Sequence, residues 1–150
     1  MFRIEKILSY LPTAVEMAKV SKDRKKKVSA IVFGPEYEVR STGVNGFPRG
    51  VEENLPERHE TPEKFYWTCH AEENVISQAA RSGVSLMGCT LLVTGLYPCS
   101  TCARMIIQSG IRRVVVPYME RPESKWYEQY LRSSKMFEES GVSVRFYRME

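Results

Sequence analysis

The sequence lacks long apolar runs and has few cysteines. No segment approaches the roughly 20 apolar residues that a membrane-spanning helix needs. Charges at Arg3, Glu5 and Lys6 interrupt the region where a signal peptide would be apolar. Four cysteines in 150 residues are too few for a disulfide scaffold. We therefore expect a soluble, cytoplasmic protein that does not contact a membrane.

The sequence also has no internal repeat and no low-complexity linker. Its length suits one domain with its own core, so residues 1–150 are expected to form a single domain. With 22 basic and 18 acidic residues the formal net charge is +4, and the basic run from Lys22 to Lys27 holds one acid, Asp23. Such a charge suits an anionic small molecule as well as nucleic acid, and the run could equally be a solvated loop.

Apolar periodicity predicts an alternation of helices and strands. Helices are predicted over residues 3–20, as one helix or as two separated near Pro12, and over 71–81, 98–110 and 123–139. Strands are predicted over 28–33, 37–44, 90–94, 113–116 and 142–146. Residues 46–67 are predicted to form a long loop with little regular structure. The first two strands predict an antiparallel hairpin and the later ones parallel pairs, so we expect an α/β fold, a three-layer αβα sandwich with a mixed five-stranded sheet.

Two short segments hold residues that bind metals, and each lies at the predicted start of a helix. They are Cys69-His70-Ala71-Glu72 and Pro98-Cys99-Ser100-Thr101-Cys102. Helix positions three apart share a face, so Cys99 and Cys102 can direct both sulfurs to one point, with His70 as a third ligand. The positive end of a helix stabilises thiolates and disfavours imidazolium. Three protein ligands leave one coordination position open, which is typical of catalytic zinc.

Glu72 decides what such a metal centre could do. It follows His70 by two positions, close enough to the open position to move a proton without ligating the metal. The pattern H-x-E followed by P-C-x-x-C is the signature of zinc-dependent nucleobase deaminases. Taken singly, Glu72 could be a helix-start charge, Cys99 and Cys102 a redox pair, and His70 a structural histidine. Their occurrence together and in this order favours the metal centre.

Over nearly its whole length the sequence resembles the cytidine deaminase-like superfamily and, within it, the deoxycytidylate (dCMP) deaminases. Besides the metal motifs, the resemblance rests on Ser21-Lys22-Asp23, on residues 41–50, on His70-Ala71-Glu72-Glu73-Asn74 and on residues 106–114. The most discriminating stretch is Asn45-Gly46-Phe47-Pro48-Arg49-Gly50, because many zinc deaminases share the metal motif but not this loop.

The resemblance implies a zinc-dependent hydrolase that converts dCMP to dUMP and ammonia. Glu72 would take a proton from the attacking water, pass it to ring N3 and later protonate the departing amine. Asn45 and Ala71 are carried over as substrate-binding residues, and Tyr118 as a stacking or phosphate-side group. Members of the family are commonly hexamers that dCTP activates and dTTP inhibits.

Resemblance and charge placement together indicate residues for such an effector. A triphosphate bound together with Mg²⁺ needs clustered cations and free backbone amides. The residues expected to contact it are Lys22, Asp23, Lys27, Gly43, Asn45 and Arg81.

The sequence departs from the family in two places. Some relatives bind a second, structural zinc through an additional cysteine and histidines, but here the only other histidine is His59 and no cysteine precedes Cys69. We therefore expect one Zn²⁺ per chain. The first strand reads Val28-Ser29-Ala30 where the family usually has Val-Gly-Ala, which affects close packing rather than chemistry.

Two other functions stay open at this point. One is deamination of cytidine, guanine or tRNA adenosine; the other is a catalytically silent nucleotide-binding module. The loop with Phe65, Tyr66 and Trp67 also carries five glutamates, and this acidity disfavours a nucleic-acid track. A purely structural zinc site would have no need of Glu72.

Overall fold

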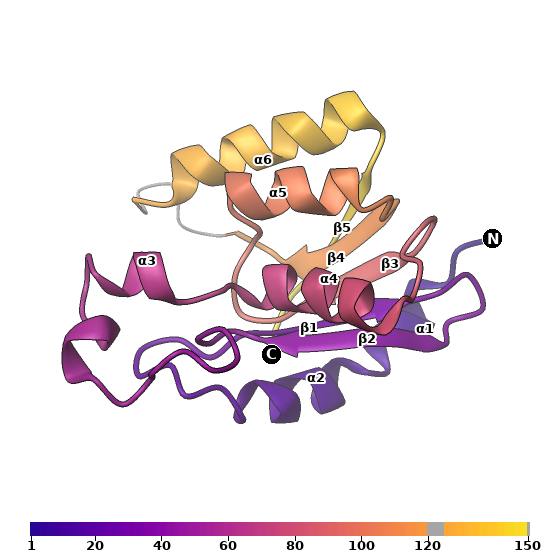
Figure 1. Cartoon of the computed structure of the whole chain (residues 1–150). Helices are drawn as coiled ribbons and strands as arrows, with labels where there is room; N and C mark the ends of the chain where they lie inside the picture. Colours follow the sequence, from indigo (N-terminus) through magenta and orange to yellow (C-terminus); the bar gives the residue numbers. More distant parts are fainter. Residues whose placement is uncertain (120–124, 150) are drawn as a thin grey trace.

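Five strands form one mixed sheet in the order β2-β1-β3-β4-β5 (Figure 1). They are β1 (Ser29–Phe33), β2 (Val39–Val44), β3 (Thr90–Val93), β4 (Arg113–Pro117) and β5 (Ser143–Tyr147) in the computed structural model, which describes residues 1–119 and 125–149. Strand β1 runs antiparallel to β2 and β3, whereas β3, β4 and β5 are parallel. The predicted hairpin and parallel pairs are confirmed; the antiparallel β1–β3 pair between them was not predicted.

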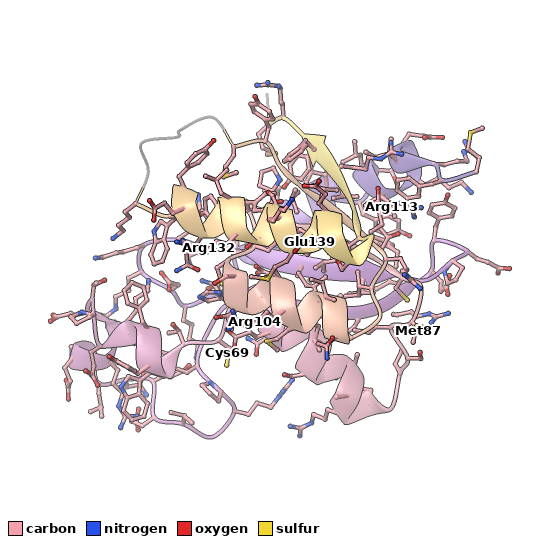
Figure 2. The ribbon with its side chains drawn as sticks, turned by 90° about the horizontal axis from the view of Figure 1, so that it is seen from above. Cys69, Met87, Arg104, Arg113, Arg132 and Glu139 are labelled. Atoms are coloured by element: carbon pink, nitrogen blue, oxygen red, sulfur yellow. The ribbon has the colours of Figure 1, made fainter. Side chains whose placement is uncertain are left out.

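Helices cover both faces of the sheet, so the predicted three-layer α/β sandwich is confirmed. Helices α4 (Ala71–Ser82), α5 (Ser100–Gln108) and α6 (Tyr127–Ser140) lie on one face, and α1 (Ile4–Leu8) and α2 (Leu11–Ala18) on the other (Figure 1). Neighbouring strand residues point to opposite faces. Val32 accordingly packs with α4 and α5, and Ile31 with α1 and α2. Seen from above, α5 and α6 lie side by side (Figure 2).

Turn residues set several helix ends. Helix α2 starts beside Pro12, so the two-helix alternative for residues 3–20 is the one observed. Gly83 ends α4 in the left-handed conformation (φ 70°), as its position predicted. Helix α5 begins at Ser100 rather than Pro98, with Cys99 as its N-cap. Helix α6 is described from Tyr127; the predicted start at 123 lies outside the described residues.

The stretch from 46 to 67 contains two short helices that periodicity did not predict. These are η1 (Pro56–His59) and α3 (Lys64–Trp67). Four residues cannot form a stable helix alone, so contacts elsewhere in the fold must hold α3 in place. Lys64 supplies one such contact through an ion pair with Asp23, with Nζ 2.8 Å from Oδ2.

Strand β2 approaches α4 closely and fixes the start of this helix. A Cβ atom at Gly43 would lie 2.6 Å from the backbone nitrogen of Val75. Asn74 donates from Nδ2 to the carbonyl oxygen of Val44 at 2.7 Å, and Ser41 donates from its hydroxyl to the carbonyl oxygen of Val75 at 2.7 Å. These contacts position the first turn of α4.

None of the helices in residues 1–119 and 125–149 has the length and apolarity to span a bilayer.

Candidate metal centre and active site

The structure brings together the three predicted metal ligands. His70 is the N-cap of α4, Cys99 is the N-cap of α5, and Cys102 lies in the first turn of α5. His70 Nδ1 lies 3.3 Å from Cys102 Sγ and 3.5 Å from Cys99 Sγ, and all three ligand atoms lie within 4.8 Å of one another. Tetrahedral zinc separates a nitrogen and a sulfur ligand by about 3.6 Å. The residues present therefore fit a zinc ion.

The pKa values of the three candidate ligands shift in different directions. The hydrogen bond from Cys102, with a further bond to His70, lowers the pKa of the Cys99 thiol to about 4 despite its burial. The bond to Cys99 raises the pKa of His70 to about 9 against the effect of burial. The same thiolate raises the pKa of Cys102, and burial adds to that shift. A divalent cation that binds here would displace the protons of His70 and Cys102.

Glu72 lies beside the ligands in the first turn of α4, and its side chain is buried with a residue exposure of 4%. Burial raises the pKa of its carboxyl, opposed chiefly by the charge of His70. A carboxyl with a raised pKa can accept a proton in one step and return it in another. Glu72 stands outside the cluster of three ligand atoms, as expected for a proton carrier.

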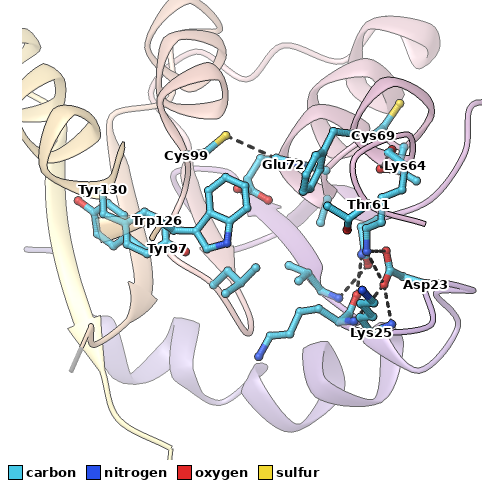
Figure 3. Close-up of a pocket in the computed structure, with 18 of the residues that line it drawn as sticks. Asp23, Lys25, Thr61, Lys64, Cys69, Glu72, Tyr97, Cys99, Trp126 and Tyr130 are labelled. Atoms are coloured by element: carbon cyan, nitrogen blue, oxygen red, sulfur yellow. Dashed lines mark hydrogen bonds and ion pairs between the residues drawn. The ribbon is translucent and has the colours of Figure 1, made fainter. Parts of the chain in front are cut away.

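A cavity of about 270 Å³ adjoins these residues (Figure 3). His70, Glu72 and Cys99 contribute to its wall. The other described residues that line it come from the loop between α2 and β1, the residue after β2, α3 and its flanks, the start of α4, the segment after β3 and the start of α6. They are Asp23, Lys25, Lys26, Val28, Asn45, Thr61, Lys64, Phe65, Thr68, Cys69, Ala71, Leu96, Tyr97, Lys125, Trp126 and Tyr130. Four of the lining side chains are lysines and two are carboxylates. The excess of positive charge favours an anionic group on the bound molecule.

The ion pair between Asp23 and Lys64 neutralises one of these lysines. Burial acts to raise the pKa of Asp23, but the hydrogen bonds from Lys64 and from the backbone amides of Lys26 and Lys25 hold it below its ordinary value. Asp23 Oδ1 accepts both amide hydrogen bonds at 2.9 Å, which fixes the turn that carries the two lysines. Lys25 and Lys26 therefore come to the cavity on an ordered backbone.

The three predicted substrate-binding residues differ in position. Ala71 and Asn45 line the cavity. Asn45 also fastens the loop before β1, since its Oδ1 accepts the Val28 amide hydrogen at 2.9 Å and its Nδ2 donates to the Lys26 carbonyl oxygen at 2.8 Å. Tyr118 is not among the described lining residues. Its ring contacts Phe146, with centroids 5.8 Å apart.

Two of the residues expected to bind an effector, Asp23 and Asn45, line the cavity described above. Lys22 and Asp23 border a second, small hollow of about 10 Å³, where Lys22 forms an ion pair with Glu53. Lys27 donates from Nζ to the Ser21 carbonyl oxygen. Gly43 is packed against α4, and Arg81 lies in the last turn of that helix.

Several cavity residues were missed by the sequence analysis. Phe65 was noted near the site but not as a substrate-binding residue, and Lys25, Lys64 and Trp126 were not singled out. Trp126 precedes α6 and, like Lys125 and Tyr130, lies far along the chain from the metal ligands; only the packing of α6 beside α5 brings it there. No local pattern carries that information.

Comparison with known proteins identifies the family. Residues 4–118 match the family described as "Cytidine and deoxycytidylate deaminase zinc-binding region". The chain belongs to this family. It is therefore a zinc-dependent deaminase, a hydrolase, and His70, Cys99 and Cys102 provide the ligand set that its zinc requires.

Several relatives match most of the chain. An uncharacterized deaminase in the luxG 3' region of Aliivibrio fischeri is 39% identical over 127 residues, covering 83% of this chain and 81% of the relative. The deoxycytidylate deaminase of Mus musculus is 30% identical over 141 residues, covering 91% and 76%. Among solved structures, the dCMP deaminase of cyanophage S-TIM5 in complex with dCMP and dUMP has a TM-score of 0.77 and 27% identity. That match covers 98% of this chain and all 100% of the other.

Proposed function

We propose that the protein hydrolyses dCMP to dUMP and ammonia. The supporting observation is the cavity, which joins the metal ligands and buried Glu72 to three lysines, Lys25, Lys26 and Lys125, beyond the pair that Lys64 makes with Asp23. A pyrimidine nucleotide offers a matching base and phosphate. The similarity to deoxycytidylate deaminases, one of them solved with dCMP and dUMP bound, supports the same substrate.

Glu72 moves the protons of the proposed reaction. Zinc held by His70, Cys99 and Cys102 would supply the Lewis acidity that makes water nucleophilic near neutral pH. Glu72 accepts a proton from the attacking water and delivers it to ring N3 of the base. It then transfers the second proton of the water to the departing amine, which leaves as ammonia. The low exposure of Glu72 keeps these protons from exchanging with bulk water.

Lys25, Lys26 and Lys125, which we call the rim lysines, orient the substrate at the cavity. Lys25 and Lys26 on one side and Lys125 on another attract the 5′-phosphate, and each charge-assisted hydrogen bond is stronger than a neutral one. Asn45 and Ala71 border the space between the rim and the metal ligands, where the sugar and base would lie. Substrates without a phosphate would lose the rim contacts and keep the others.

The test is to follow ammonia release from dCMP, CMP, deoxycytidine and a single-stranded oligonucleotide. We expect dCMP to have the highest kcat/KM. In Lys25→Ala, kcat/KM for dCMP should fall by about tenfold with that for deoxycytidine unchanged. Lys19→Ala, which removes an exposed lysine outside the cavity, is the matched control. Preference for another substrate would overturn the proposal of dCMP.

We further propose that the enzyme is regulated in the manner of its family, as a hexamer activated by dCTP and inhibited by dTTP, with Mg²⁺ accompanying the triphosphate. The charge of Lys22 at the second hollow, with Lys27 in the same basic run, supports this proposal. Deamination rates test the regulation; they are measured with each effector and magnesium in the native chain, in Lys22→Ala and in Lys27→Ala. The sedimentation coefficient tests the hexamer. Unchanged effector responses in both variants would contradict the assignment of these lysines.

A further inference from the structure

We propose that Trp126 is a specificity-determining residue, whose indole forms the wall against which the pyrimidine ring of the substrate stacks, and that Phe65 holds this indole in position. We call Phe65 and Trp126 the aromatic pair. The inference rests on the proposed function for the identity of the nucleotide, and it assigns a base-binding contact that the signature motifs do not contain.

The aromatic pair joins two distant segments at the cavity. The ring centroids of Phe65 and Trp126 lie 5.8 Å apart with the planes at 82°, an edge-to-face arrangement that aromatic pairs prefer. Both rings line the cavity together with Glu72. In Figure 3, Trp126 lies on the side occupied by Cys99, Tyr97 and Tyr130, whereas Lys64 and Thr61 lie on the other. A planar base between the rim and the ligands would therefore meet an aromatic wall.

Anchored backbone holds each member of the aromatic pair. Next to Phe65, the ion pair of Lys64 with Asp23 fixes α3, with side-chain exposures of only 15% and 6%. Thr68 secures the end of this helix by donating from its hydroxyl to the Lys64 carbonyl oxygen at 2.8 Å. Trp126 is the N-cap of α6, and its carbonyl oxygen accepts the Tyr130 amide hydrogen at 3.1 Å. Both rings are thus held on ordered segments before any ligand arrives.

The two rings of the aromatic pair differ in exposure. Trp126 is half-buried and packs against the core, with Lys125 Nζ 5.3 Å from its ring centroid, whereas Phe65 lies nearer the surface. Phe65 is 46% exposed, although burying a phenylalanine is favourable by about 2 kcal/mol. The neighbouring Trp67 is not among the described residues that line the cavity. Its ring instead stacks under the Arg58 guanidinium, which lies 3.7 Å from the ring centroid. A partly exposed ring that faces a cavity is suited to contact a ligand, and stacking suits any flat base.

The rim lysines and the aromatic pair divide the recognition of the substrate. The lysines bind the phosphate and cannot distinguish one base from another, because every nucleotide carries the same phosphate. The aromatic pair borders the cavity beside Glu72, so it determines how a ring can approach this carboxyl. We infer that it favours a pyrimidine over a purine.

Tryptophan fluorescence provides a direct test, because the chain contains only two tryptophans. In Trp67→Phe, Trp126 is the sole tryptophan, and combination with Glu72→Gln stops turnover. Titration of this zinc-loaded double variant with dCMP should quench the emission saturably, with the dissociation constant that calorimetry gives. The same titration with dGMP should produce no saturable change. Binding of dCMP in the calorimeter with unchanged emission would overturn the stacking contact, and equal quenching by dGMP would overturn the pyrimidine preference.

Kinetics of Trp126 variants supply a second measurement. Trp126→Ala should raise KM for dCMP by about 10- to 100-fold with a smaller effect on kcat, since base stacking on an aromatic ring has about this value. Trp126→Phe retains a ring and should stay within about threefold of the native KM. Equal KM values in the native chain, Trp126→Phe and Trp126→Ala would overturn the proposal, and zinc content verifies that each variant is folded.

The stacking contact and the proposed substrate can fail separately. If deoxycytidine binds and quenches Trp126 emission while dCMP does neither, the proposed substrate is wrong and the stacking contact is supported. If dCMP is turned over and binds without changing the emission, dCMP stands as the substrate and the contact with Trp126 is wrong.

Discussion

The Gln129 side chain joins α6 to the metal-binding turn of α5 by accepting two hydrogen bonds from Ser100. The Ser100 amide nitrogen lies 3.3 Å from Gln129 Oε1, and the Ser100 hydroxyl oxygen lies 3.1 Å from the same atom. Helix starts leave amide hydrogens without intrahelical partners, and Gln129 satisfies one of them from a neighbouring helix. Since Ser100 follows Cys99 directly, the contact also orients a metal ligand.

Removal of this acceptor should weaken both the fold and the metal site. In Gln129→Ala we expect the free energy of unfolding to fall by about 1 kcal/mol, the usual value of a helix cap. The dissociation constant for zinc should rise by about tenfold, as for other groups that orient ligands. Urea unfolding and competition with a chromophoric chelator measure the two effects. Gln108→Ala, at the exposed end of α5, is the control, and equal behaviour of the two variants would rule out the role of Gln129.

Replacement of Glu72 should separate metal binding from turnover. Glu72→Ala and Glu72→Gln leave the three ligands intact, so the zinc content should equal that of the native chain. Turnover should fall by a factor of at least about 100, because no other group performs the proton transfers. Metal analysis and ammonia release from the same preparations give both quantities. Native rates in Glu72→Gln would remove Glu72 from the mechanism.

The raised pKa of Glu72 also predicts the pH dependence of the rate. The carboxylate must be ionised to accept the first proton, so kcat/KM should decline as pH falls through the pKa of this group. Since burial raises that pKa, the acidic limb should lie above the ordinary glutamate value. A profile of kcat/KM from pH 4 to 9 locates the limb. A limb at or below the ordinary value would contradict a protonation of Glu72 as its cause.

Local sequence patterns explain why so much of the metal centre could be predicted. His70 and Glu72 lie within one helical turn, and Cys99 and Cys102 within another, so their relative positions follow from helix geometry alone. The strands were predictable for a similar reason. Buried residues fill β1 and β3 completely, and such short apolar runs are typical of central strands.

The rest of the cavity depends on contacts between distant segments. Helix α3 has four residues and no periodicity, and it forms where Lys64 meets Asp23. Trp126 reaches the cavity only because α6 packs against α5. The protonation of His70 depends likewise on Cys99, which lies on another helix. None of these relationships is encoded in a single stretch of sequence.

Zinc binding to the metal-free protein should release about two protons near pH 7. Cys99 has already lost its proton at this pH, since its pKa is about 4, whereas His70, with a pKa of about 9, and Cys102 still carry theirs. Both must be displaced before the nitrogen and sulfur can bind the metal. Calorimetry in buffers of different ionisation enthalpy counts the protons. Between pH 5 and 8 the affinity should fall by about 100-fold for each unit of pH decrease, and a pH-independent affinity would contradict this assignment.

The pair of Asp23 and Lys64 should stabilise the fold at neutral pH and cease to do so in acid. The folded-state pKa of Asp23 lies below its unfolded value of about 3.9, so the contribution is present above that value. It is lost as pH falls through the lowered folded pKa. Asp23→Asn should therefore reduce the free energy of unfolding by about 2 kcal/mol at pH 7 and by progressively less below pH 4.

Urea unfolding of Asp23→Asn and of the native chain at each pH measures this difference. Any loss of zinc in acid that the two proteins share cancels from the difference. Glu16→Gln removes the exposed pair with Lys19 and serves as the control, with an expected change near zero. A difference between Asp23→Asn and the native chain that stayed constant from pH 7 to pH 3 would exclude the ionised pair as its source.

Gly43 should tolerate no side chain, because β2 lies directly against the backbone of α4. A methyl group there would stand 2.6 Å from the Val75 nitrogen and 3.0 Å from the Ala71 carbonyl oxygen, and both are main-chain atoms that cannot rotate away. Gly43→Ala should therefore lower the free energy of unfolding by about 2 kcal/mol and shift the start of α4, which raises the dissociation constant for zinc through His70. Gly46→Ala is the matched control, since a Cβ there meets nothing within 4 Å. If Gly43→Ala and Gly46→Ala had equal stability and zinc affinity, the contact of β2 with α4 could not be what positions the catalytic turn.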